Sequence, residues 1–150
     1  MTVSFDVRML NLLLDSYLKL TGKELVPAGR RGPAAAKWLY EAPLGVLMHD
    51  TSPDPLFIYA NRTALRLFGY GRDEFIGLPS RLSAGEQDRE TRDRLMASVL
   101  RDGYTDGYSG PRIRKDGTQF QIEVSSIWNV LDPDAAIVGQ AAMIRRWRSQ

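Results

Sequence analysis

The sequence predicts an α+β domain built on one five-stranded antiparallel sheet, and three observations lead to this class. Two short segments rich in β-forming residues precede a run of short helical segments, and three more follow it. Turn residues separate the last three segments, as expected for strands joined by hairpins. A chain of 150 residues with 43% apolar and 25% charged residues also has the size and composition of a domain with a single core.

Residues 4–20 predict a helix whose apolar arc is wider than one core face requires. Its polar residues share one narrow stripe: Arg8, Asn11, Asp15 and Lys19. The wide arc has two interpretations, because the helix either lies wholly on its own domain or also contacts the same helix of a second copy. In the second case the dimer interface consists of Phe5, Met9, Leu10, Leu13, Leu14 and Tyr17.

A loop and a short helix connect this first helix to the rest of the chain. The loop is rich in Gly and Pro, and residues 34–41 predict a helix that Pro43 ends. We therefore expect an N-terminal helical extension over residues 1–43 and a core over residues 44–147.

The core begins with two strands and a capped helix. Residues 44–49 form an apolar run typical of a buried strand, residues 50–55 are turn formers, and residues 56–60 are rich in β-formers. Asn61 then stands where a helix N-cap is expected, because its side chain can accept a hydrogen bond from a free backbone N–H of the first turn.

A longer helix is predicted from Glu86 to Arg101, after one helical turn over residues 73–76. Ser83 and Glu86 have the spacing of a capping box that opens this helix. Its charged residues pair at i,i+4 spacing, each pair contributing about 0.2–0.5 kcal/mol on an exposed face. The pairs are Asp88/Arg92, Arg89/Asp93 and Glu90/Arg94. They predict a face that lies in solvent.

The last third of the chain predicts three strands. Residues 108–114 and 120–131 flank a hairpin turn, and the second strand changes phase near Ser125, as at a β-bulge. Residues 137–144 predict the third strand. A polar tail follows it: Arg145, Arg146 and Arg148. Five strands with short helices on one side would leave a pocket between the sheet and those helices.

Several residues are candidates for binding a ligand in that pocket. They are His49, Tyr59, Arg81, Tyr108, Arg112, Trp128 and Gln140. His49 is either a ligand contact whose charge Asp50 adjusts or a strand-end residue hydrogen-bonded to the following turn. Arg81 and Arg112 are suited to bind a carboxylate or phosphate through paired hydrogen bonds, or else they form ion pairs within the protein.

The aromatic and amide candidates carry a similar choice. Tyr59, Tyr108, Trp128 and Gln140 lie on predicted strands, where they either line the pocket or take part in ordinary sheet packing. Alternation along the strand puts Tyr108 and Arg112 on one face and Ser109, Pro111 and Ile113 on the other. The sequence leaves open which of these sets faces the pocket.

Composition excludes several classes of function. The chain has no Cys, which excludes a cysteinyl photoadduct, a thiol nucleophile and Cys-ligated metal, and its single His excludes a multi-His metal site. A net charge of +2 is no footprint for nucleic acid, and no apolar run is long enough to span a membrane. We expect a cytoplasmic protein that binds neither nucleic acid nor membrane.

Five segments resemble the MEKHLA domain, a PAS-related family found in bacterial proteins and at the C-terminus of plant class III homeodomain–leucine zipper proteins. They are YLKLTGKEL (17–25), LYEAPLGVLMHDTSPDPLFIYANRTALRLFGY (39–70), LPSRLSA (78–84), DGYSGPRIRKDGTQFQIE (106–123) and IWNVLDPDAAIVGQAA (127–142). The resemblance covers nearly the whole chain, and it implies a PAS-like fold, with short helices on one face of the sheet, and a sensory or protein-interaction role.

The resemblance implies no settled cofactor. PAS domains bind haem, flavin or small metabolites, dimerise, and pass a signal to an effector. The cysteine of the light-sensing branches is missing here, and the helix before the last three strands lacks the His that usually ligates haem. The cofactor therefore stays unknown.

We accordingly expect a non-enzymatic sensory or regulatory domain that dimerises, binds a small ligand between sheet and helices, and passes a signal to a separate partner protein. One alternative is a small isomerase- or cyclase-like enzyme that uses His49 and Asp50. Another is a purely structural dimerisation module whose pocket is filled by its own side chains. A cavity of about 300 Å³ or more with convergent polar groups would favour ligand binding.

Overall fold

The computed structural model describes residues 6–149, and it confirms the predicted five-stranded antiparallel sheet. The strands are β1 (Gly45–His49), β2 (Phe57–Ala60), β3 (Tyr104–Ile113), β4 (Gln119–Leu131) and β5 (Ile137–Ser149). They lie in the order β2-β1-β5-β4-β3, and each neighbouring pair is antiparallel. The register shifts twice between Ile122 and Ser125, which confirms the predicted bulge in β4.

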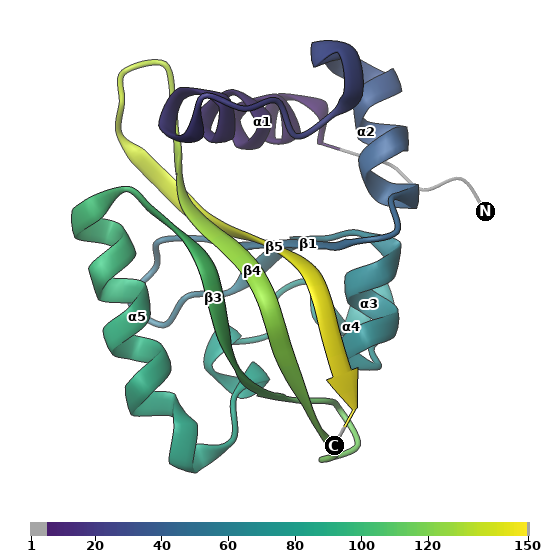
Figure 1. Cartoon of the computed structure of the whole chain (residues 1–150), viewed down its shortest axis with the longest axis vertical. Coiled ribbons are helices and arrows are strands. Elements are labelled where there is room, and N and C mark those ends of the chain that lie inside the picture. Colours follow the sequence, from purple (N-terminus) through teal and green to yellow (C-terminus); the bar gives the residue numbers. More distant parts are fainter. Residues whose placement is uncertain (1–5, 150) are drawn as a thin grey trace.

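Helical segments cover both faces of this sheet (Figure 1). They are α1 (Val7–Thr21), η1 (Pro27–Gly29), α2 (Gly32–Glu41), α3 (Arg62–Phe68), α4 (Arg72–Phe75), η2 (Ser80–Ser83), η3 (Glu86–Asp88) and α5 (Arg89–Asp102). The helices α1 and α2 lie over one face, whereas α3, α4 and α5 lie over the other. Within residues 6–149, no helix combines the length and the apolar character needed to cross a membrane.

Capping groups explain where α1 and α3 begin and where α1 ends. The Asp6 carboxylate accepts a hydrogen bond from the Met9 N–H at 3.0 Å, and Gly22 ends α1 in the left-handed region at φ 75°. The Asn61 side chain accepts from the Ala64 N–H at 3.0 Å at the start of α3. This contact confirms the predicted N-cap.

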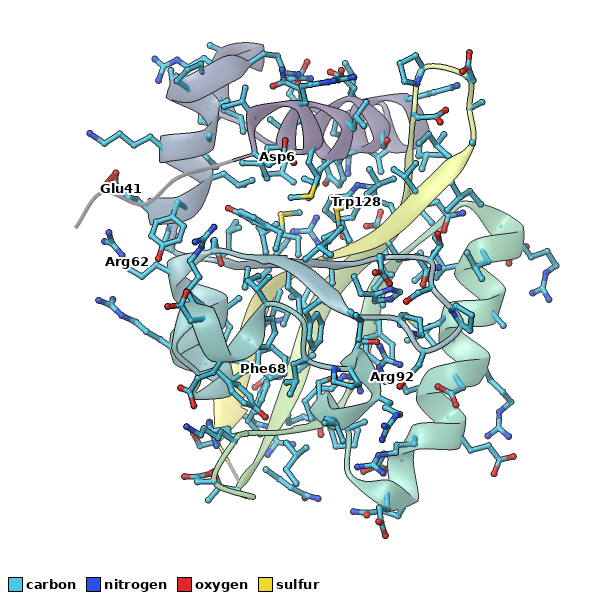
Figure 2. All side chains as sticks on the ribbon, turned by 180° about the vertical axis from the view of Figure 1, so that it is seen from behind. Asp6, Glu41, Arg62, Phe68, Arg92 and Trp128 are labelled. Carbon is cyan, nitrogen blue, oxygen red and sulfur yellow. The ribbon has the colours of Figure 1, made fainter. Side chains whose placement is uncertain are left out.

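The apolar arc of α1 packs inside the chain's own core. Leu10, Leu13, Leu14 and Tyr17 are between 0% and 3% exposed, and they share one cluster with residues of the sheet and of α2. Figure 2 shows Trp128 between α1 and the sheet, where its ring meets the Tyr17 ring edge-on at a centroid distance of 4.9 Å.

This packing corrects the expected dimer interface. The arc is wide because α1 contacts the sheet below it and α2 beside it, so its four buried side chains are not accessible to a second copy. Met9 is half-buried against the same cluster, and Phe5 lies outside the described residues. The first interpretation of the helix, burial on its own domain, is therefore the correct one for these four residues. The division of the chain at residue 43 stays a prediction.

Three local predictions differ from the structure. The Ser83 hydroxyl donates to the Ser80 carbonyl at 2.7 Å, so no capping box forms with Glu86, and α5 starts only at Arg89. Strand β3 starts four residues before the predicted boundary, at Tyr104 rather than Tyr108. The predicted polar tail is part of β5, because it continues the ladder with β4.

Candidate functional site

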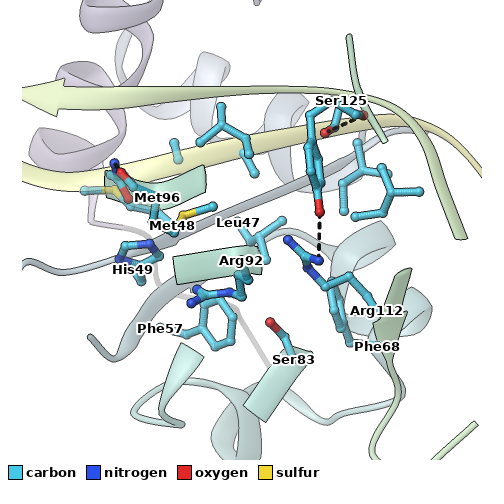
Figure 3. A pocket seen from close by; sticks show the side chains of 17 residues that line it. Leu47, Met48, His49, Phe57, Phe68, Ser83, Arg92, Met96, Arg112 and Ser125 are labelled. Carbon is cyan, nitrogen blue, oxygen red and sulfur yellow. Dashed lines mark hydrogen bonds between the residues drawn. The ribbon is translucent and has the colours of Figure 1, made fainter. Parts of the chain in front are cut away.

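A small cavity lies between the sheet and the segment from η2 to α5 (Figure 3). Its volume is about 50 Å³, so the cavity by itself is smaller than the roughly 300 Å³ that would favour ligand binding. A larger cleft of about 360 Å³ lies next to it, between the 50–55 loop and α5. The two share His49, Arg92, Met96 and Gln140 as lining residues, so the cleft adjoins the cavity. Most of the remaining cavity wall is apolar: Leu47, Met48, Phe57, Phe68, Ile122, Ile127, Ala141, Ala142 and Ile144.

Two buried arginines face this cavity. Arg92 of α5 and Arg112 of β3 are each 7% exposed. Burial, and after it the positive charge of Arg112, lower the pKa of Arg92 to about 10. The Arg92 guanidinium donates to the Ser80 hydroxyl at 2.9 Å, and its nearest carboxylate is the exposed Asp93, at 3.6 Å. The site therefore holds two neighbouring positive charges in a mostly apolar surrounding.

Arg112 is held by neighbours on its own strand. Its Nη1 donates to the Tyr108 hydroxyl at 3.0 Å and to the Pro111 carbonyl at 2.7 Å. The Tyr108 ring lies directly over Gly110. A Cβ at position 110 would be only 2.8 Å from Tyr108 Cζ, so a larger residue there would clash with the ring. Glycine at position 110 thus lets Tyr108 reach Arg112. No carboxylate within residues 6–149 lies within 4.0 Å of the Arg112 guanidinium.

His49 brings an unpaired acceptor to the same cavity. Its Nδ1 lies 2.8 Å from the Asp50 carbonyl oxygen, which can only accept, so Nδ1 carries the proton and Nε2 a free lone pair. The side chain is 9% exposed, and Nε2 is buried without a hydrogen-bond partner in the described part of the chain. Burial is the largest cause that lowers the pKa of His49, and the charge of Arg92 lowers it too, against the opposing effect of Asp50.

The lowered pKa of His49 predicts that the protein loses stability as the pH falls below about 6.5. The unfolded chain binds a proton on this residue near that pH, whereas the folded chain resists it. The free energy of unfolding should therefore decrease toward pH 5.5 by at most about 1.4 kcal/mol per pH unit. Urea denaturation between pH 5.5 and 8 measures this slope.

The control for that experiment is His49→Gln, which should flatten the slope. The chain has a single His, and the pKa values of Asp50, Glu74 and Asp116 are lowered, which moves their titration further below this range. A wild-type curve that stays flat from pH 7.5 to 5.5 would show that His49 titrates normally in the folded protein.

Two amide side chains attach α5 to the sheet beside the cavity. Gln140 Nε2 donates to the Met96 carbonyl at 3.0 Å and to Asn129 Oδ1 at 3.1 Å. Asn129 Nδ2 in turn donates to the Val99 carbonyl at 2.9 Å. The C-terminal half of α5 is therefore fixed to β4 and β5, and Arg92 lies toward its other end.

Residues 7–149 match the model of the MEKHLA domain. The chain belongs to the MEKHLA domain family. Comparison with solved structures places the fold of this MEKHLA domain among PAS and light-oxygen-voltage domains. None of the curated proteins matches it.

Three solved structures illustrate the likeness. The PAS domain of a Colwellia psychrerythraea protein has a TM-score of 0.63 and 19% identity, over 77% of this chain and 92% of that chain. A light-oxygen-voltage domain studied with a flavin analogue has a TM-score of 0.59 and 23% identity, over 78% and 84%. An RNA-binding light-oxygen-voltage receptor has a TM-score of 0.67 and 19% identity, over 85% of this chain and 35% of the receptor. At these identities the likeness shows the fold alone.

The MEKHLA domain brings His49, Tyr108, Arg112 and Gln140 together around the cavity, as expected from the sequence. The strand set that faces the cavity is therefore the one with Tyr108 and Arg112. Arg81 lines only the outer cleft, where its side chain is 48% exposed and pairs with Asp54 at 3.3 Å. The ion pair with Asp54 is the second of the two interpretations of Arg81, and the arginine that faces the cavity together with Arg112 is Arg92.

Tyr59 and Trp128 lie in the other layer, which corrects their predicted place in the pocket wall. Both belong to the cluster under α1 and α2, and the Trp128 Nε1–H donates to the Leu13 carbonyl at 3.1 Å. Strand alternation explains the difference, because Trp128 is one residue from Ile127, which does face the cavity.

Arg92 was missed because it was counted in a solvated face of charged pairs. Of those pairs, the structure contains the contact between Arg94 and Glu90, at 2.9 Å, while Arg92 points inward. Its spacing from Met96 and Val99, by four and seven residues, places it on the inner face of α5. This spacing is the sequence feature that indicates an inward-facing Arg92.

The enzyme alternative lacks its side-chain pair. The Asp50 carboxylate accepts hydrogen bonds from the Ser52 N–H at 3.1 Å, the Ser52 hydroxyl at 2.6 Å and the Leu56 N–H at 3.0 Å. It therefore caps its own loop, and the hydrogen bond of the His49 ring goes to the Asp50 backbone carbonyl instead. A general base oriented by that carboxylate is not formed. The part of the chain that the structure describes also contains no cluster of three or more His, Asp or Glu that could hold a metal ion.

Proposed function

We propose that this MEKHLA domain is a non-enzymatic sensory or regulatory domain that binds a small anion between Arg92 and Arg112. The observation that carries the proposal is the pair of arginine residues, each 7% exposed, in a cavity wall that is mostly apolar. Arg92 has only the exposed Asp93 as a carboxylate neighbour, at 3.6 Å, and Arg112 has none within 4.0 Å in the described residues. Two buried positive charges with so little compensation favour the binding of a negative charge.

An anion between the two groups has the donors it needs. A guanidinium offers a planar fork of N–H donors that matches the two oxygens of a carboxylate. Arg92 uses Nη2 for Ser80 and its Nη1 lies 3.6 Å from Asp93, while Arg112 uses Nη1 for Tyr108 and Pro111. N–H groups remain on both side chains. The same contacts hold the two forks in place before a ligand arrives.

The cavity does not fit a flavin or a haem. Its volume of about 50 Å³ is far below the roughly 300–1,000 Å³ of pockets that bury a drug-sized ligand. The chain also has no cysteine for a photoadduct. The cleft of about 360 Å³ next to the cavity gives a small ligand a way in and room for a protruding end.

The binding event would reach a separate partner through α5. This helix carries Arg92 at the cavity and Leu100, which is 47% exposed, at the wall of the adjoining cleft. Tyr104, 39% exposed, starts β3 directly after it. Large exposed apolar side chains of this kind support a contact with another protein. Dimerisation is part of the proposal, and Leu18, at 37%, is the large apolar side chain of α1 that remains open to a second copy.

A thermal-shift panel tests the anion site. Small anions such as propionate and phosphate should raise Tm of the wild type by about 5–10 °C at a hundredfold excess over Kd. A small cation, choline, and a small neutral amide, propionamide, should leave Tm unchanged. In Arg112→Gln the shift should disappear, because one of the two forks that hold the anion is lost.

The matched control is Arg101→Gln, which removes a guanidinium whose side chain is 73% exposed on α5. It should respond to anions like the wild type. Circular dichroism checks that Arg112→Gln is folded, which we expect because this change removes a buried charge. An anion panel that leaves wild-type Tm unchanged, or an Arg112→Gln variant that responds fully, would refute the proposed site.

A further inference from the structure

The cavity contains an acceptor that a simple anion would leave unused. His49 Nε2 is buried and has no hydrogen-bond partner in the described residues, because Nδ1 already donates to the Asp50 carbonyl. An unsatisfied buried acceptor costs about 1–3 kcal/mol, so its presence points to a ligand atom that donates to it.

The acceptor lies beside the proposed anion site. His49 and Arg92 line both the cavity and the adjoining cleft, and the charge of Arg92 acts on the His49 ring. Figure 3 shows Arg92 between the His49 ring and the Arg112 side chain. A ligand held by the two guanidinium groups therefore has His49 Nε2 as a neighbour. Anionic oxygens are acceptors and would repel this lone pair, so the ligand needs a donor close to its charged group.

Size and lining narrow the ligand further. A water molecule requires about 10–15 Å³ of such space, so a cavity of about 50 Å³ holds roughly three to five small groups. The wall around them includes Leu47, Phe57 and Ile127, which offer no hydrogen bonds. Phosphate would bring four polar oxygens into this wall, whereas a carboxylate with one hydroxyl and a short alkyl chain matches both its polar and its apolar parts.

We propose that the ligand is a short-chain 2-hydroxycarboxylate, an inference that rests on the proposed anion site. Its carboxylate accepts hydrogen bonds from Arg92 and Arg112, and its hydroxyl donates to His49 Nε2. The alkyl end lies against the apolar wall or extends into the cleft. No bond is made or broken, and the hydroxyl keeps its proton.

Isothermal titration with matched pairs tests this ligand class. The pairs are each enantiomer of lactate against propionate, and of 2-hydroxybutyrate against butyrate, with phosphate as a separate anion. In the wild type one enantiomer of each hydroxy acid should bind at least about tenfold more tightly than its deoxy partner. Without the ligand hydroxyl, His49 Nε2 stays buried with no hydrogen-bond donor. In His49→Leu the two members of each pair should bind equally.

A second measurement does not depend on a variant. The chain has a single His, so a long-range proton–nitrogen NMR spectrum shows one imidazole. The 2-hydroxybutyrate enantiomer that binds should shift the Nε2 nitrogen resonance, because Nε2 then accepts a hydrogen bond. Butyrate should leave the Nε2 chemical shift unchanged.

The outcomes separate this inference from the anion site. If propionate or phosphate binds as tightly as lactate, the hydroxy-acid assignment is wrong while the anion site remains. If His49→Leu keeps the preference, or the Nε2 resonance does not move, His49 is not the acceptor. If no anion binds the wild type, the anion site itself fails.

Discussion

Replacing Leu13 by aspartate is expected to unfold the domain. Leu13 is 0% exposed in the layer between α1 and the sheet, and its carbonyl accepts the Trp128 Nε1–H at 3.1 Å. A carboxylate in this apolar layer loses its hydration, and the leucine contacts disappear as well. The combined loss should exceed about 4 kcal/mol, a large share of the 5–15 kcal/mol that stabilises a typical domain.

Leu18→Asp on the same helix is the matched control. Leu18 is 37% exposed, so the new carboxylate stays in water and the free energy of unfolding should change by less than about 1 kcal/mol. Urea denaturation followed by circular dichroism compares the two variants. If Leu13→Asp is as stable as Leu18→Asp, α1 does not lie on its own sheet. Light scattering of the folded Leu18→Asp variant also reports whether the exposed side of α1 joins two copies.

Asn61→Ala should have the second-largest effect, a loss of about 3–5 kcal/mol. Asn61 is 0% exposed and its side chain makes four hydrogen bonds. Oδ1 accepts from the Val46 and Ala64 N–H groups at 2.9 and 3.0 Å, and Nδ2 donates to the Leu39 and Leu44 carbonyls at 2.9 and 2.8 Å. One amide thus joins the end of α2, the start of β1 and the start of α3. Alanine leaves buried backbone groups of all three without a partner.

The neighbouring Thr63→Val variant isolates the value of a single contact. The Thr63 hydroxyl donates only to the Ala42 carbonyl, at 2.7 Å, in a half-buried position. Its removal should lower the free energy of unfolding by about 1 kcal/mol. Chemical denaturation of both variants compares their losses in free energy of unfolding. A loss for Asn61→Ala no larger than that for Thr63→Val would mean that the amide serves as an N-cap alone.

Much of the fold was predictable because local chemistry sets it. Asn61 was recognised as a cap from its position after a β-rich segment, and the turn at residues 115–117 from its Asp-Gly pair. The alternation of apolar residues predicted three C-terminal strands and the bulge near Ser125. Each of these signals acts within a few residues, where backbone dihedrals and nearby hydrogen bonds dominate.

The candidate site was only partly predictable. His49, Tyr108, Arg112 and Gln140 were found because polar or aromatic side chains on buried strands need a partner. Arg92 was missed because its i,i+4 spacing to Asp88 predicted a surface pair, although its seven-residue spacing to Val99 places it on the inner face of α5. The structure places Arg92 on that inner face, where it is 7% exposed.

The order of elements, the antiparallel pairing and the Asn61 cap follow from the chain's own periodicity and turn chemistry, which need no distant contact. Which side of the sheet faces which layer of helices does not follow from the sequence. Both sides are apolar along the strands, so the local pattern cannot tell one from the other. Packing of α1 and α2 over one side encloses Trp128 and Tyr59 there. The opposite side is thereby left to Arg92, Arg112 and His49, whose meeting depends on contacts between α5, β3 and β1 that lie far apart in sequence.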